Sequence, residues 1–137
     1  MKKKLIETYV FFIFAALVCV FLVDAYNSNR SGKSTIFNAA IYGQLDLIKE
    51  YVKQGKDMNS QDEYGATLLH YSLQSGHTGI SKFLVISEAD VNIMDKEELT
   101  PLDWAHWMNQ VETAKLIREY GGKTGEELKA AEPVAKA

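Results

Sequence analysis

Residues 62–70 read DEYGATLLH and residues 95–103 read DKEELTPLD, so one pattern recurs thirty-three positions further along the chain. The same register holds without a gap as far as Ala89, which matches Gly122. One period earlier the likeness is weaker, but residues 57–59 still match residues 90–92. A fixed period near 33 is the signature of stacked helical repeats.

Each copy has the internal pattern of a helix pair. Thr67 can satisfy free backbone donors at the start of a first helix. Gly76 ends that helix in the left-handed turn that glycine and asparagine adopt at low cost, and Asn109 occupies the equivalent place one period later. Apolar residues then recur at helical spacing on a second helix: Ile80, Phe83 and Leu84. One such pair buries too little apolar surface to be stable alone, so we expect the copies to stack.

These residues resemble the repeats of the ankyrin family, and the likeness covers residues 29 to 126. The matching positions in the middle copy are Asp62, Gly65, Thr67, Leu69, His70, Gly76, His77 and 89–92. In the third copy they are Asp95, 100–102, Ala105, Leu116 and Ile117. The resemblance implies an all-α solenoid of about three stacked helix-turn-helix units. It also implies a protein that binds other proteins, with no cofactor and no enzymatic activity.

The expected organisation has three parts. Residues 1–25 form a signal peptide or an anchor, and residues 26–126 form the repeat domain. Its units span about 29–61, 62–94 and 95–126. Residues 127–137 form a C-terminal tail, and the composition from Glu126 onward can extend a last helix as far as Pro133.

The copies depart from the family pattern at a few positions. Phe37 stands where His70 does, so the first unit keeps only the skeleton of a repeat. Glu88 and Glu98 replace turn glycines, and Leu68 replaces a proline. Three units are also close to the minimum that a stable stack needs. We therefore expect a marginally stable domain that frays first at its first unit.

The first 25 residues have the pattern of a targeting segment. Lysines occupy positions 2–4, residues 9–23 are apolar without interruption, and Ala25 follows. This pattern is typical of a secretory signal cleaved after Ala25. An uncleaved hydrophobic helix stays open as the alternative, because the stretch from Leu5 approaches the roughly 20 residues that span a bilayer. With cleavage the body is periplasmic or secreted; without it the body is held outside the cytoplasm by a single-pass anchor.

Composition and charge exclude several partners and sites. The chain has 137 residues and a net charge of −3, and from residue 26 onward it carries 12 basic and 16 acidic side chains. A mildly acidic body gives no basis for binding the phosphate backbone of a nucleic acid. Cys19 is the only cysteine, so neither an internal disulfide nor a cysteine-based metal site can form.

Two apparent chemical motifs have structural explanations. Residues 32–35, GKST, end like a phosphate-binding loop, but Asn27 occupies the position of the required first glycine. His70 and His77 fall on recurrent ankyrin positions, where the imidazole bridges neighbouring loops, and His106 is expected to be half-packed. No glutamate or cysteine is placed to complete a metal site with them. We therefore expect no metal and no catalytic residue.

The candidate binding residues come from the turn tips and from the exposed sides of the first helices. In ankyrin stacks these positions line one concave face. The candidates are Tyr42, Tyr64, Gln74, Glu97, Trp107 and Met108. Tyrosine and tryptophan are the types that most often dominate protein interfaces. For each single residue, packing against an adjacent helix or loop is the alternative.

The sequence predicts a monomer that binds another protein through this concave face, outside the cytoplasm. The alternative is a membrane-anchored structural or assembly subunit, tethered by its N-terminal segment, that positions a membrane complex.

Overall fold

The computed structural model describes residues 35–132, and this part of the chain is helical with no strand. Residues 35–41 are helical, and six further helices follow. They are α2 (Leu45–Lys53), α3 (Leu68–Gln74), α4 (Thr78–Ile86), α5 (Pro101–Trp107), α6 (Val111–Glu119) and α7 (Gly125–Ala131). The predicted N-terminal hydrophobic helix lies outside the described residues.

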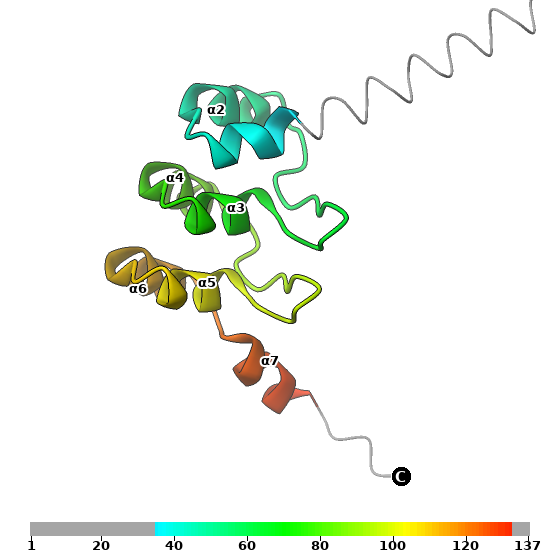
Figure 1. Ribbon diagram of the computed structural model, residues 1–137, viewed down its shortest axis with the longest axis vertical. Helices are drawn as coiled ribbons and strands as arrows, with labels where there is room; N and C mark the ends of the chain where they lie inside the picture. The colour runs from blue at the N-terminus through cyan, green and yellow to red at the C-terminus, as the bar shows by residue number, and fades with distance from the viewer. Residues whose placement is uncertain (1–34, 133–137) are drawn as a thin grey trace, which may run out of the picture. The chain divides into compact units, whose positions relative to one another are not determined.

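The helices form layers that follow one another in a row (Figure 1). α3 begins at Leu68 and α5 at Pro101, 33 residues later; α4 begins at Thr78 and α6 at Val111, the same interval. Helix α3 contacts α4 within its own unit and α5 in the next, and α4 contacts α6. Because each unit packs on its neighbour, the architecture is the solenoid that the repeat period predicts.

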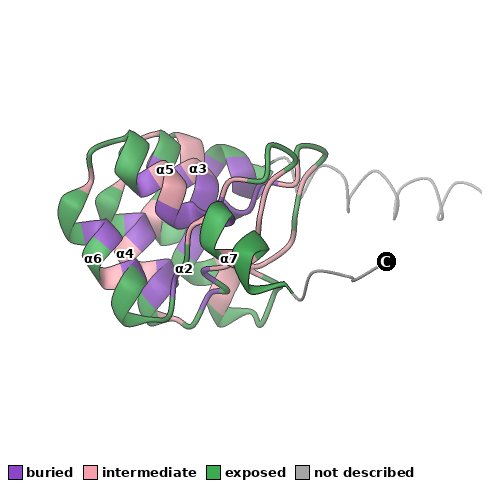
Figure 2. Cartoon of the chain, turned by 90° about the horizontal axis from the view of Figure 1, so that it is seen from below, coloured by how far each residue is buried: buried purple, intermediate pink, exposed green. Residues whose placement is uncertain are grey.

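The core runs along the stack between the layers. The helices carry buried residues on part of their surface and exposed residues on the rest (Figure 2), and the buried apolar side chains form one cluster. Leu68 and Leu73 on α3, Leu84 on α4, Leu102 on α5 and Ile117 on α6 are all fully buried. Each such side chain contributes roughly 1.5–3 kcal/mol of hydrophobic stabilisation. Leu84 and Ile117, which the repeat register matches, therefore occupy equivalent core positions in successive units.

The turns between paired helices confirm the prediction that Gly76 and Asn109 adopt a left-handed conformation. Gly76 has φ of 75° and Asn109 has φ of 52°, so both adopt the left-handed conformation that ends the first helix of a unit. Glu88 (φ 65°) and Glu98 (φ 64°) adopt it too, although their side chains make it costly. The backbone of these turns is therefore kept even where the sequence departs from glycine.

Helix α7 begins a partial fourth layer. Its start at Gly125 follows the end of α6 without the long turn that separates the other units. Thr100 Oγ1 donates to the carbonyl oxygen of Lys123 at 2.7 Å, and the N–H of Gly125 donates to Oδ2 of Asp103 at 2.8 Å. The predicted boundary between repeat domain and tail, at residue 126, falls inside this helix.

Candidate functional site

The long turns before α3 and α5 are held by one aspartate each. We call residues 62–66 and 95–99 the finger loops, and together with α3 and α5 they form the inner face. Oδ1 of Asp62 accepts the N–H groups of Tyr64 and Ala66, both at 2.9 Å. Oδ1 of Asp95 accepts those of Glu97 at 2.9 Å and Leu99 at 3.0 Å. Each aspartate therefore fixes the shape of its own loop.

The second oxygen of each aspartate binds an aromatic side chain nine residues later. Tyr71 Oη donates to Oδ2 of Asp62 at 2.5 Å, and Trp104 Nε1 donates to Oδ2 of Asp95 at 2.9 Å. Burial, together with the Asp62 hydrogen bond, raises the pKa of Tyr71, so its hydroxyl stays protonated. Both finger loops are thus tied to the inner helices that follow them.

His70 joins one unit to the next. The N–H of Thr67 donates to Nδ1 of His70 at 3.1 Å, which leaves the ring proton on Nε2, where it faces the Leu99 carbonyl oxygen at 3.3 Å. Burial lowers the pKa of His70, so the ring is neutral at pH 7. His77 makes an equivalent link, with Nε2 2.9 Å from the carbonyl oxygen of Ile41. These contacts confirm the bridging role predicted for both histidines.

The expectation for His106 was wrong. Its side chain is exposed on α5. Leu73, the matching residue one period earlier, is instead buried. The repeat register therefore predicts backbone position well, and burial less well, at the last layers of the stack.

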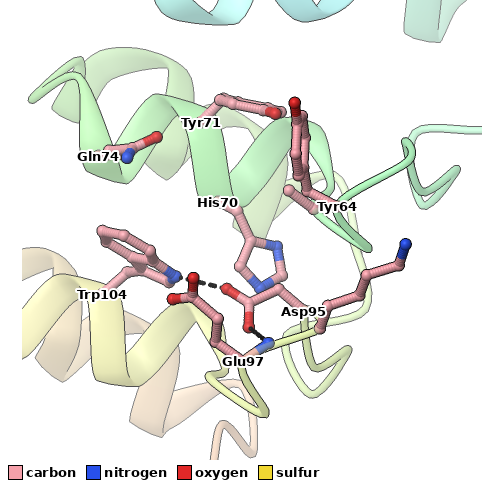
Figure 3. Close-up of a pocket in the computed structure, with 9 residues that line it drawn as sticks. Tyr64, His70, Tyr71, Gln74, Asp95, Glu97 and Trp104 are labelled. Carbon is pink, nitrogen blue, oxygen red and sulfur yellow. Dashed lines mark hydrogen bonds between the residues drawn. The ribbon is translucent and has the colours of Figure 1, made fainter.

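A pocket of about 280 Å³ opens on the inner face between the two finger loops and the helices α3 and α5 (Figure 3). Its lining comprises Tyr64, Ala66, His70, Tyr71, Gln74, Asp95, Lys96, Glu97 and Trp104. Three of the residues singled out from the sequence, Tyr64, Gln74 and Glu97, are brought together here. They come from two finger loops and one helix.

The other three candidates lie outside this lining. The exposed fractions of Tyr42, Trp107 and Met108 are 73%, 68% and 42%. Trp107 adjoins the pocket, because its ring meets that of Trp104 edge to face with centroids 5.5 Å apart. Part of the Trp107 side chain thus packs against Trp104, and most of its surface stays exposed to solvent.

Sequence reasoning missed Tyr71 and Trp104. A signal was present: each lies three residues before a candidate position, Gln74 or Trp107, and residues three apart share one face of a helix. Nothing in the linear pattern shows that either side chain forms a hydrogen bond to an aspartate nine residues earlier.

The sequence matches a known protein family. A family model for ankyrin repeats, in three copies, matches residues 36–127. The chain belongs to the ankyrin-repeat family. Ankyrin repeats generally mediate protein–protein interaction and form modules that are typically non-catalytic.

Three known proteins that are similar to the chain are much longer than it is. Alpha-latrocrustotoxin-Lt1a of Latrodectus tredecimguttatus is 36% identical over 80 residues, which are 58% of this chain and 6% of the toxin. The RelA-associated inhibitor of Mus musculus is 30% identical over 86 residues, 63% of this chain and 10% of that protein. Ankyrin repeat and SAM domain-containing protein 6 of Rattus norvegicus is 34% identical over 91 residues, 66% and 10% respectively. The ankyrin chain thus spans a tenth or less of each.

Two further findings hold for the described part of the ankyrin chain. Among residues 35–132, no helix combines the length and apolar character needed to cross a bilayer. The same residues contain no cluster of three histidine, cysteine or acidic side chains that could hold a metal ion. The segment predicted to be a signal or an anchor lies outside this range.

Proposed function

We propose that the chain is a non-catalytic binding module that holds another protein on its inner face. The observation that carries this proposal is the gathering of Tyr64, Gln74 and Glu97 around one pocket, with exposed Trp107 beside it. Exposed aromatic side chains next to a preformed hollow are typical of the residues that dominate binding energy at protein interfaces.

The inner face is organised before a partner arrives. Asp62 and Asp95 fix the two finger loops, and the N–H of Lys96 donates to the carbonyl oxygen of Tyr64 at 3.0 Å, so one loop holds the next. Ordering loops and side chains on binding costs free energy. Because that cost is reduced here, a modest contact area can give selective binding.

The test is capture of a partner by the full chain and by matched variants. Tyr64→Ala and Trp107→Ala remove large exposed side chains from the inner face, and we expect each to weaken capture of the same partner about tenfold or more. Val111→Ala is the control, because Val111 is 70% exposed on the outer helix α6. A partner lost with Val111→Ala and retained with the other two variants contradicts the proposal.

We further propose that the repeat domain acts outside the cytoplasm. The support is the sequence of residues 1–25, with its lysines followed by an apolar stretch. Sequencing the N-terminus of the mature protein distinguishes the two routes. A start at Tyr26 indicates a released module, whereas an intact Met1 or Lys2 in a membrane fraction indicates the anchored assembly subunit. Repeat domain that stays protected from added protease when only the cytoplasmic membrane is left intact contradicts both.

A further inference from the structure

Three aromatic rings from three different elements line the pocket: Tyr64 from a finger loop, Tyr71 from α3 and Trp104 from α5 (Figure 3). The face of an aromatic ring carries partial negative charge and attracts a cation that lies within about 6 Å of its centre. Tyr71 and Trp104 donate their polar hydrogens to carboxylates, which polarises both rings further toward negative charge.

The pocket lining also carries more carboxylate charge than cationic charge. Asp95 accepts only neutral donors, and within the described residues the Glu97 side chain has no ion pair. Against these two carboxylates the described lining holds one cation, Lys96, which is exposed. His70 adds no positive charge, because its ring is buried and neutral. The lining is therefore acidic as well as aromatic.

The size of the pocket favours the end of one side chain. Sites for small molecules and cofactors usually enclose about 300–1,000 Å³, and this pocket, at about 280 Å³, falls just below that range. A planar guanidinium can stack on aromatic rings while its N–H groups donate to a carboxylate. Glu97 and the amide oxygen of Gln74 supply acceptors at the rim.

We propose that this pocket binds a cationic side chain, arginine or lysine, presented by the partner protein. The proposal rests on the proposed function and deepens it, because it states the chemistry that the partner must bring to the inner face. The partner carries a basic residue that enters between Tyr64, Tyr71 and Trp104, with its charge next to Glu97.

A titration followed by NMR tests the pocket without knowledge of the partner. The chain has two tryptophans, so the full ¹⁵N-labelled protein has two indole N–H signals, and Trp107→Phe assigns that of Trp104. The probes are Nα-acetyl-arginine amide and Nα-acetyl-lysine amide. Nα-acetyl-citrulline amide is the control, because it has the shape of the arginine probe without its charge. We expect the Trp104 signal to shift to saturation with a cationic probe, and citrulline to bind at least about threefold more weakly.

A pair of charge-matched variants locates the binding site. Glu97→Gln removes the free carboxylate at the rim and should weaken binding of the cationic probe roughly 3- to 30-fold. Glu119→Gln removes the same charge from the exposed end of α6 and should leave binding unchanged. Equal shifts with arginine and citrulline, or equal affinity in Glu97→Gln and the unaltered protein, overturn the cation proposal.

The two proposals fail separately. Loss of partner capture in Trp107→Ala, together with no response to either cationic probe, leaves the binding module standing and overturns the cation pocket. A saturable, charge-dependent probe response with no inner-face dependence of capture supports the pocket and overturns the proposed function.

Discussion

His70 connects two repeats only while its ring is uncharged. Its Nδ1 accepts a hydrogen bond from the N–H of Thr67 and its Nε2 faces the carbonyl oxygen of Leu99, in a position that is almost fully buried. A second ring proton would have to replace the bond to Thr67 and would place a charge away from water. Folding therefore lowers the pKa of this ring below its ordinary value near 6.5.

The first prediction is a loss of stability in mild acid. Below pH 6.5 the unfolded chain binds a proton at His70, whereas the folded protein resists it. The stability that the neutral His70 ring contributes is therefore complete above pH 6.5, and it is lost as the pH falls toward the folded-state pKa. We expect the free energy of unfolding to fall by up to about 1 kcal/mol between about pH 7.5 and about pH 5.5, measured by urea denaturation.

Two variants test whether His70 causes this fall in the free energy of unfolding with pH. His70→Gln should remove most of it, whereas His106→Gln, at an exposed position, should retain it. Glu127 does not contribute in this range, because its hydrogen bond to Arg118 lowers its pKa to about 2. An unchanged slope in His70→Gln contradicts the neutral bridge.

The second prediction concerns Glu88, which ends α4 in a left-handed turn with φ of 65°. A side chain makes this conformation unfavourable by roughly 1–2 kcal/mol, and glycine relieves it at some cost in unfolded-state entropy. We expect Glu88→Gly to raise the free energy of unfolding by about 0.5–1 kcal/mol. Glu98→Gly should gain less, because Glu98 also pairs with Lys129. Calorimetric melting checks both, with Lys115→Gly, at an exposed position in the middle of α6, as a control that should lose stability.

At the scale of elements, α7 depends on the close approach of one glycine to the layer above it. A Cβ added at Gly125 would lie 2.1 Å from the carbonyl oxygen of Glu98, which is backbone and cannot give way freely. Three further interactions tie this segment to the third unit: Thr100 with Lys123, Arg118 with Glu127, and Lys129 with Glu98.

The third prediction is that Gly125→Ala detaches α7. Relief of the clash requires the helix to shift, and overpacking of this kind costs about 1–3 kcal/mol. Hydrogen exchange should show loss of protection in residues 125–131 and in α6. Gly79→Ala is the matched control, since nothing lies within 4 Å of its added Cβ and alanine favours helix, so its stability should be equal or higher. Equal protection of α7 in both variants contradicts the docking described.

Helices could be predicted well because their ends are local properties. Gly76 and Asn109 mark turns through their own backbone preference, and the structure confirms both. The last helix was expected from Glu126 onward on composition alone, and α7 begins one residue earlier. The period of 33 does not reach it, because Thr124 begins this helix without the long turn that precedes Thr67 and Thr100. The roles of Tyr71 and Trp104 were missed because they depend on partners in the finger loops, which only the folded chain brings close.

At the scale of the whole molecule, stability is distributed unevenly along the stack. Helix α2 buries Ile48 alone, whereas α4 buries Ile80, Ser81, Leu84 and Val85. In a solenoid each unit is held by its own contacts and by its neighbours, so a unit with a small buried surface opens first.

The fourth prediction is therefore a gradient of protection. Amide hydrogens of α2 should exchange at least about tenfold faster than those of α4 under native conditions. Native-state hydrogen exchange with mass spectrometry measures both in one sample. Equal exchange would mean that the domain opens only as a single cooperative unit, contrary to the expectation of fraying at its first unit.

The most direct test of the central claim, that a partner protein binds the inner face, is photocrosslinking from defined positions. A photoreactive phenylalanine analogue is placed at Gln74, on the rim of the pocket, or at Ile86, exposed at the end of the outer helix α4. We expect a specific adduct with one partner from position 74 and none from position 86. An adduct from position 86 alone would contradict it.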